Sequence, residues 1–129
     1  MAKRKSINYP GFKHQNPIPN ASRIGNIVMS SIISGRDPQT GATPSDLAGQ
    51  VTNVFKQIRL CVEAAGGSVE DIIKVNFWMK DPATGRAALN GEWAAMFPDP
   101  SSRPARHTLA LPADNPTHVT CDFTAVVDA

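Results

Sequence analysis

The stretch TPSDLAGQVTNVFKQIRLCVEAAGG, from Thr43 to Gly67, is followed closely by IIKVNFWM, from Ile72 to Met79, and these two segments decide the fold. In the first, apolar residues recur at steps of three and four, which is typical of an α-helix with one buried face. They are Leu47, Val51, Val54, Phe55, Ile58, Cys61, Val62 and Ala65. The second segment is apolar on nearly both faces and therefore predicts a central strand.

Turn and capping residues mark both ends of the expected helix. Thr43 is the expected N-cap, with Pro44 at the first helical position and Asp46 completing a start that resembles a capping box. A hydroxyl and a carboxylate at these positions can accept hydrogen bonds from the free amides of the first turn. Gly66 and Gly67 are expected to end the helix.

The remaining pattern predicts further strands and a second helix around this pair. The expected elements are a strand Ile27 to Ile33, preceded by one or two short strands, a helix from about Ala83 to Phe97 opened by Asp81 and Pro82, and closing strands Ala105 to Leu111 and Thr117 to Val127. This order favours one mixed sheet with both helices on a single face, an α+β layer pair. Since the other sheet face has no helix to cover it, the chain is expected to self-associate and to form any pocket where subunits meet.

Length and charge exclude several classes of protein. With 129 residues the chain is expected to be a single domain spanning 1–129, with a flexible or loosely ordered start at 1–15. The net charge of +2 comes partly from Lys3, Arg4 and Lys5 and is too weak and local to indicate a nucleic-acid partner. The sequence shows neither a membrane span nor a secretion signal, so a cytoplasmic protein without a membrane partner is expected.

The cysteines and histidines do not indicate a metal site. Cys61 and Cys121 have no ligand spacing and are expected to be buried, reduced and inert thiols. His14, His107 and His118 also lack the spacing of metal ligands. The sequence therefore predicts no metal site.

One cation in the closing strands calls for an anionic partner. The run PARHTLAL, Pro104 to Leu111, carries Arg106, and strand alternation puts Thr108 on the same face. In the run Thr117 to Val127, alternation puts Asp122 on the face opposite to the apolar residues. If the two strands are neighbours, these groups line a single pocket suited to a small carboxylate ligand. The alternative is that Arg106 and Asp122 form a structural ion pair or a subunit contact.

Several motifs together resemble one known family. They are GNIVMSS, DPQTG, VEAAGGSVEDIIKVNFWMKD, LNGEWAAMFP, PAR and the final strand. Their order and spacing, from about Asn16 to Val127, resemble the RidA/YjgF family of enamine and imine deaminases, also described as endoribonuclease L-PSP-like. The resemblance implies a chorismate-mutase-like α+β fold and a homotrimer with clefts between adjacent subunits. It also implies hydrolysis of small enamine or imine carboxylates, such as 2-aminoacrylate, to keto acids and ammonia without metal or cofactor.

The resemblance also assigns roles to individual residues. Arg106, in the PAR signature, is the expected anchor for the substrate carboxylate. Asp122 falls where deaminating members carry a glutamate and is the expected acid/base that orients the attacking water. Asn90 and Ser31 fall where the family has an asparagine and a serine beside the cleft.

Four positions depart from the family pattern. Ile32 replaces a glycine whose amide binds the ligand carboxylate, Ile18 replaces a cleft tyrosine, Thr108 replaces a cysteine, and Asp122 is one methylene shorter than the family's glutamate. The two isoleucines favour a ligand with an apolar portion, and a longer amino-enoate such as 2-aminomuconate competes with 2-aminoacrylate as substrate. Alternatively they fill the cleft and leave a non-catalytic trimer that binds small carboxylates or a regulatory protein partner. A ribonuclease ranks third, because the residues supply no paired His or Lys for RNA cleavage.

Overall fold

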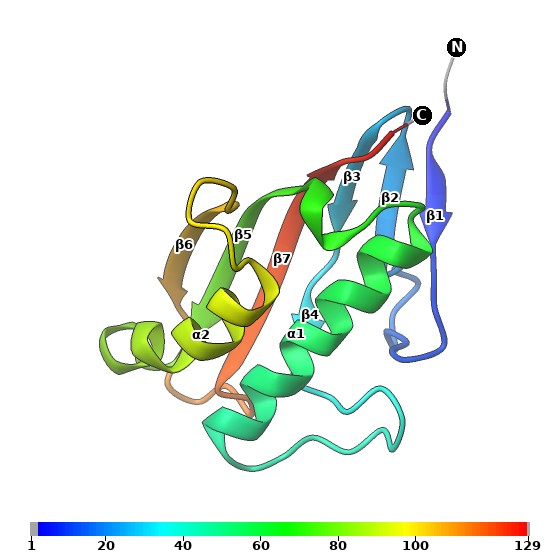
Figure 1. The fold of residues 1–129 in the computed structure, drawn as a ribbon. Coiled ribbons are helices and arrows are strands. Elements are labelled where there is room, and N and C mark those ends of the chain that lie inside the picture. The colour runs from blue at the N-terminus through cyan, green and yellow to red at the C-terminus, as the bar shows by residue number, and fades with distance from the viewer. Residues whose placement is uncertain (1–2, 129) are drawn as a thin grey trace.

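The computed structural model describes residues 3–128 and consists of one mixed sheet with two helices packed on the same face (Figure 1). The strands are β1 (Lys5–Ile7), β2 (Ala21–Ile24), β3 (Ile27–Ser30), β4 (Ile33–Ser34), β5 (Ile72–Met79), β6 (Ala105–Ala110) and β7 (Val119–Val126). The helices are α1 (Leu47–Ala64) and α2 (Pro82–Met96), with a 3-10 turn, η1, at Val69–Asp71. This arrangement confirms the α+β layer pair that the sequence predicts.

The strand order in the sheet is β1-β2-β3-β7-β5-β6, with β4 also paired to β7. Every pair is antiparallel except β5 and β6, which are parallel and joined through the crossover helix α2. The predicted central strand is confirmed, since β5 lies between β7 and β6. Residues 1–15, expected to be a loose start, include β1, which pairs with β2. No helix within residues 3–128 is long and apolar enough to cross a membrane.

Helix α1 buries the apolar stripe against the sheet, as predicted, but it begins later than the capping pattern suggested. Its N-cap is Asp46, whose carboxylate accepts a hydrogen bond from the Gly49 amide at 2.9 Å. The expectation that Thr43 caps the helix is therefore wrong. The physical reason is that the Pro44 carbonyl accepts from the Gln50 side chain at 2.8 Å, which ties the preceding segment outside the helix. Gly66, with φ of 93°, ends α1 in the left-handed conformation that glycine tolerates best.

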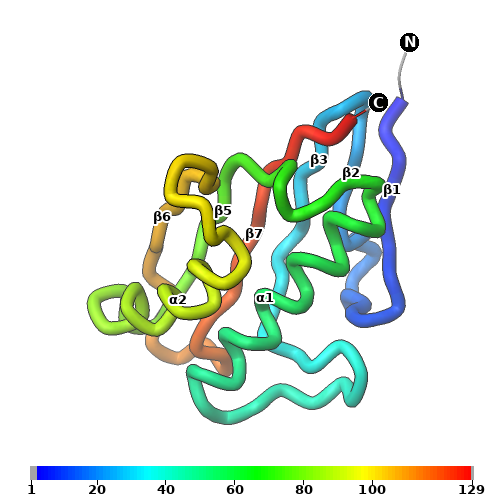
Figure 2. Tube along the Cα trace, in the orientation of Figure 1, coloured from blue at the N-terminus to red at the C-terminus, as the bar shows by residue number. Residues whose placement is uncertain are grey.

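A second set of α1 residues, buried amides beside the apolar stripe, ties the helix to distant loops. The Gln50 side chain bridges Pro44 and the chain entering β7, because its Oε1 accepts from the His118 amide at 2.8 Å. Asn53, 5% exposed, donates to the Gly35 carbonyl at 3.0 Å. Figure 2 shows the long excursion that the chain makes between β4 and α1, and these amides hold its two ends.

Gln57 is fully buried and makes the largest number of these contacts. Its Nε2 donates to the carbonyls of Gly11 at 3.1 Å and Arg36 at 2.9 Å, while its Oε1 accepts from the Tyr9 hydroxyl at 2.6 Å. Burial raises the pKa of Tyr9, so this hydroxyl keeps its proton for donation. One side chain thus joins the N-terminal loop, the loop after β4 and the helix layer.

The predicted strand Ile27 to Ile33 is interrupted, which corrects the expectation of one continuous element. The pairing with β7 runs Met29 to Thr124 before the break and Ile33 to Cys121 after it, so one extra residue is accommodated between β3 and β4 as in a β-bulge. Ser31 lies in the break and turns toward the segment before β2. Its amide donates to the Asn20 carbonyl at 2.9 Å.

The sheet face opposite the helices is exposed and carries an apolar row. Ile24 pairs with Ile27 and Ile27 pairs with Val126 across three neighbouring strands, and their exposed fractions are 51%, 55% and 44%. Met29, 58% exposed, lies beside this row. A contiguous apolar surface of this kind is typical of a protein interface.

Two glycines provide a matched test of how closely α1 packs on the sheet. A Cβ on Gly35 would lie 2.7 Å from the Gln50 Cα and 2.9 Å from its carbonyl oxygen, so Gly35→Ala must push α1 away from β4. We expect a loss of about 1–3 kcal/mol in the free energy of unfolding. At Gly91 in α2, a Cβ meets nothing within 4 Å, so Gly91→Ala is expected to add about 0.5–1 kcal/mol. Urea unfolding measures both, and two shifts of the same sign would contradict this packing.

Candidate functional site

The two predicted catalytic residues lie on opposite faces of the sheet in one chain. Strands β6 and β7 are not neighbours, because β5 lies between them. In the register, Arg106 pairs with Val75, which faces the helices, whereas Asp122 pairs with Asn76, which faces away from them. The condition for a pocket shared by the two strands of one chain is therefore not met, and that expectation is corrected.

Arg106 is held on the helix side of β6 by α2. Its Nη2 donates to the Asn90 Oδ1 at 3.1 Å, and its guanidinium carbon lies 5.1 Å from the centroid of the Trp93 ring. Asn90 and Trp93 are one helical turn apart, so a single turn of α2 supplies both contacts. An aromatic face below and an amide oxygen at one edge orient a guanidinium while leaving donors free.

Within the described residues, no acid lies at ion-pair distance from Arg106. The single ion pair within residues 3–128 joins Arg59 and Glu63 at 4.0 Å, one turn apart on α1. Burial, together with the positive charge of Arg86, lowers the pKa of Arg106 from its usual value, although a guanidinium stays protonated at neutral pH. The alternative of a structural ion pair between Arg106 and Asp122 is wrong for a single chain, and the cation remains available to an anionic ligand.

Asp122 is held by neutral donors on the other face. Its Oδ1 accepts from the Asn76 Nδ2 at 2.9 Å and its Oδ2 accepts from the Trp78 Nε1 at 3.0 Å. Both donors lie on β5, two residues apart, and so share a face with the carboxylate. Each carboxylate oxygen therefore has one hydrogen bond from the protein and further lone pairs for water or a ligand.

The break between β3 and β4 brings three more predicted site residues together. The Ser31 hydroxyl donates to the Pro19 carbonyl at 2.7 Å, which joins the break to the segment containing Ile18. Ile18 and Ile32 are 46% and 45% exposed, so both isoleucines present apolar surface to solvent. Thr108 lies apart from them, on the Arg106 face of β6, where it pairs with Phe77.

The predicted residues thus lie in three places, and we call the first two the arginine group and the aspartate group. The arginine group contains Arg106, Asn90 and Thr108 on the helix side of the sheet edge. The aspartate group contains Asp122, on the exposed sheet face. Ser31, Ile18 and Ile32 gather at the break beside β7.

Sequence reasoning missed the supporting residues of both groups. Neither tryptophan was expected in the site, but Trp78 contacts the carboxylate, and Trp93, which is part of the buried core, also contacts the guanidinium. Asn76 was not singled out. A usable signal was present, because alternation along IIKVNFWM puts Asn76 and Trp78 on one face of an otherwise apolar strand.

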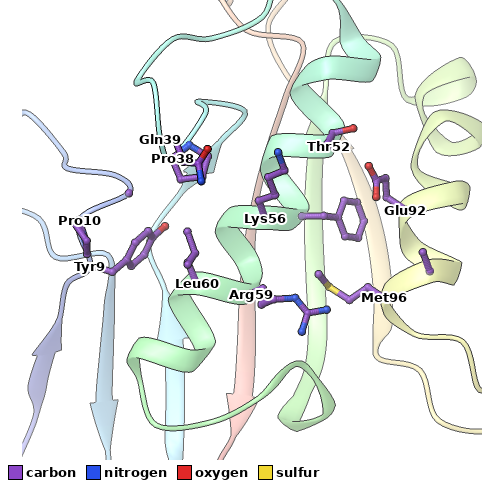
Figure 3. Close-up of a pocket in the computed structure, with 13 residues that line it drawn as sticks. Tyr9, Pro10, Pro38, Gln39, Thr52, Lys56, Arg59, Leu60, Glu92 and Met96 are labelled. Atoms are coloured by element: carbon purple, nitrogen blue, oxygen red, sulfur yellow. The ribbon is translucent and has the colours of Figure 1, made fainter.

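A separate hollow of about 620 Å³ lies over the helix layer (Figure 3). Its walls come from the N-terminal loop at Tyr9, from α1 at Lys56 and Arg59, and from α2 at Glu92 and Met96. Charges of both signs therefore surround an apolar floor. None of the predicted site residues lines it, so this hollow does not belong to either group.

The two cysteines are buried free thiols, as the sequence predicts for their position. Burial raises the pKa of Cys61 to about 12 and raises the pKa of Cys121 as well. Thiols whose pKa is raised in this way are protonated at neutral pH and are weak nucleophiles.

Comparison with known proteins gives a consistent result. The model of the family described as endoribonuclease L-PSP matches residues 13–125. A 2-iminobutanoate/2-iminopropanoate deaminase from Escherichia coli (strain K12) is 32% identical over 89 residues, which cover 68% of this chain and 69% of that protein.

Solved structures share the fold over nearly the whole chain. The crystal structure of RidA from an Antarctic Psychrobacter species has a TM-score of 0.85 at 28% identity, covering 95% of this chain and 99% of that one. A probable translation initiation inhibitor from Rhodopseudomonas palustris has a TM-score of 0.88 at 22% identity, covering 98% of this chain and 100% of that one. The second likeness concerns the fold alone.

Proposed function

Because this chain belongs to the RidA/YjgF family, described as endoribonuclease L-PSP, we propose that it hydrolyses small enamine or imine carboxylates to keto acids and ammonia. The observation that carries the proposal is Arg106, a partly buried guanidinium oriented by Asn90 and Trp93 and matched by no acid within residues 3–128. An uncompensated, pre-oriented guanidinium is suited to a planar carboxylate, which it binds through two parallel hydrogen bonds.

The reaction divides between the two groups. Arg106 binds the substrate carboxylate and so fixes the position of the neighbouring imine carbon. Asp122 accepts a proton from a water molecule while the water oxygen attacks the imine carbon. Asp122 then returns this proton to the nitrogen as the carbon–nitrogen bond breaks. The water oxygen becomes the keto oxygen, its hydrogens leave with nitrogen as ammonia, and no electrons are transferred to or from a cofactor.

We propose that the site is completed between subunits of a homotrimer. The arginine group and the aspartate group lie on different surfaces of one chain, so a second copy must bring one group to the other. A contact between two different surfaces is heterologous, and repeated around an axis it closes into a ring. The exposed row Ile24, Ile27 and Val126 supports burial of the open sheet face in such an assembly.

Ile18 and Ile32 support a substrate with an apolar portion. Both are almost half exposed beside the break, next to the strand that carries Asp122. An exposed aliphatic wall favours a carbon chain longer than that of 2-aminoacrylate, as in a 2-aminomuconate-like amino-enoate.

The activity is tested with enamines generated in situ from short and long amino-acid precursors. We expect the purified protein to accelerate ammonia and keto-acid release, with higher kcat/KM for the longer amino-enoates. A protein that is inert over the panel contradicts the proposal. If the inert protein still binds 2-ketobutyrate or benzoate in calorimetric titration through Arg106, the chain is the non-catalytic carboxylate-binding trimer considered above.

The division of the site between copies has its own test. Arg106→Ala and Asp122→Asn variants are each expected to be inactive, and each retains the group that the other lacks. Mixed trimers formed by co-refolding equal amounts recover about one quarter of wild-type activity, because about one cleft in four then combines both intact groups. If mixing recovers no activity while the mixed trimers form, the site does not combine these two groups from different subunits.

A further inference from the structure

The carboxylate of Asp122 is fixed to the sheet by two donors that neither the motifs nor the family resemblance assigns. We propose that Asn76 and Trp78 are positioning residues that hold the Asp122 carboxylate in one orientation for its work on water. This inference rests on the proposed function, because it assigns the supporting residues of the same site.

The geometry fixes the carboxylate at both oxygens. Asn76 lies directly opposite Asp122 in the antiparallel pairing of β5 with β7, and its amide reaches Oδ1 at 2.9 Å. Trp78 lies two residue pairs further along, opposite Thr120, and its indole reaches Oδ2 at 3.0 Å. Rotation of the carboxylate about its last bond breaks both hydrogen bonds, so the two donors together select one plane for it.

The chemical nature of the donors matters as much as their position. The indole N–H only donates, and the amide N–H₂ of Asn76 donates without carrying charge. A lysine or arginine in these places would form an ion pair with the carboxylate and weaken it as a base. Neutral donors orient the carboxylate and leave its negative charge for the attacking water.

Positioning is especially relevant to an aspartate at this place. Its side chain is short, so its carboxylate stays close to the sheet and cannot move far to follow a substrate. Such a short base must already be correctly oriented when the substrate binds. The reason is that a small displacement of a catalytic group lowers the reaction rate by a large factor. The fixed strand β5, which lies between β7 and β6, provides that support.

The purely structural alternative is that Asp122 satisfies two polar groups that would otherwise be half-buried without a partner. The two interpretations differ in kinetics. If Asn76 and Trp78 have only a structural role, their substitution changes stability and does not depend on Asp122. If they position Asp122, their substitution lowers kcat, and only while Asp122 is present.

The test compares Trp78→Phe and Asn76→Val in the wild-type and in the Asp122→Asn background, with kcat and KM measured on the best amino-enoate of the panel. Each substitution removes one donor and keeps most of the side-chain volume. We expect kcat to fall about 10-fold for each, with KM changed less than about 2-fold, as part of the 10² to 10⁴ that acid/base catalysis contributes. In the Asp122→Asn background we expect no further loss of kcat.

Trp93→Phe is the matched control, since it is the same substitution beneath the other charged group. A phenyl ring attracts a cation less strongly than an indole, so this variant is expected to raise KM and to change kcat less. Thermal melts at one protein concentration confirm that the variants are folded, and Asn76→Val carries the test alone if Trp78→Phe does not fold.

The outcomes separate this inference from the proposed function. An inert wild-type protein overturns both. An active wild-type protein whose kcat is unchanged in Trp78→Phe and Asn76→Val overturns the positioning role and leaves the deaminase. Losses of kcat that persist at full size in the Asp122→Asn background also overturn it, because they do not pass through Asp122.

Discussion

Arg106→Ala is expected to lower kcat/KM for amino-enoate hydrolysis by at least about 10²-fold. The two charge-assisted hydrogen bonds that a guanidinium makes to a carboxylate contribute roughly 1.5–3 kcal/mol each, and every 1.4 kcal/mol is a factor of ten. Within residues 3–128 the arginine is paired with no acid, so its removal breaks no internal ion pair. The melting temperature should therefore shift by only a few degrees, through loss of the contacts to Asn90 and Trp93.

Arg106→Lys is the control that keeps the positive charge but removes the planar guanidinium. It keeps the cation but not the two parallel donors, so we expect a kcat/KM between those of the wild type and Arg106→Ala. Ammonia release measures the activity, and calorimetric titration with 2-ketobutyrate measures binding directly. An Arg106→Ala protein that binds and turns over substrate normally rules out Arg106 as the anchor.

Gln57→Leu is expected to produce a large loss of stability. Leucine has a similar size but leaves the Tyr9 hydroxyl and the carbonyls of Gly11 and Arg36 without their partner. An unpaired buried polar group costs about 1–3 kcal/mol, so we expect a loss of about 3–5 kcal/mol in the free energy of unfolding. For a chain of this length that corresponds to a fall of roughly 10 °C or more in the melting temperature.

Gln39→Leu is the matched control, because it makes the same chemical change at an exposed loop position. Its side chain makes no hydrogen bond of the kind that Gln57 makes, so we expect a change within about 0.5 kcal/mol. Urea unfolding followed by circular dichroism compares the two at one protein concentration. Equal stability of the two variants contradicts the role assigned to the Gln57 contacts.

Local sequence patterns predicted the elements well because they depend on near neighbours. The α1 stripe and the strand Ile72–Met79 follow from periodicity alone. The choice between Thr43 and Asp46 as N-cap was decided by Gln50. This residue lies in the first turn of α1 and its side chain donates to the Pro44 carbonyl. Capping residues of similar chemistry therefore cannot be ranked without such contacts.

Features that depend on strand order were beyond the local patterns. Alternation placed Arg106 and Asp122 correctly on their own strands, but β5 lies between these strands, and its register with each puts the two side chains on opposite faces of the sheet. The partner of Gln50 at His118 is 68 positions away in the chain. The trimer follows from the resemblance to the family and not from periodicity, and it stays a prediction. The family assignment is confirmed by the match over residues 13–125.

The parallel pairing of β6 with β5 has a consequence for heat inactivation. β6 closes one margin of the sheet and has a single neighbour, and the turn of α2 that steadies Arg106 belongs to the crossover leading into it. The hydrogen bonds of an edge strand open at a lower free-energy cost than those in the interior of a domain. Warming should therefore release β6 and Arg106 before the inner strands, so that the proposed activity is lost while α1 and the inner strands are still intact.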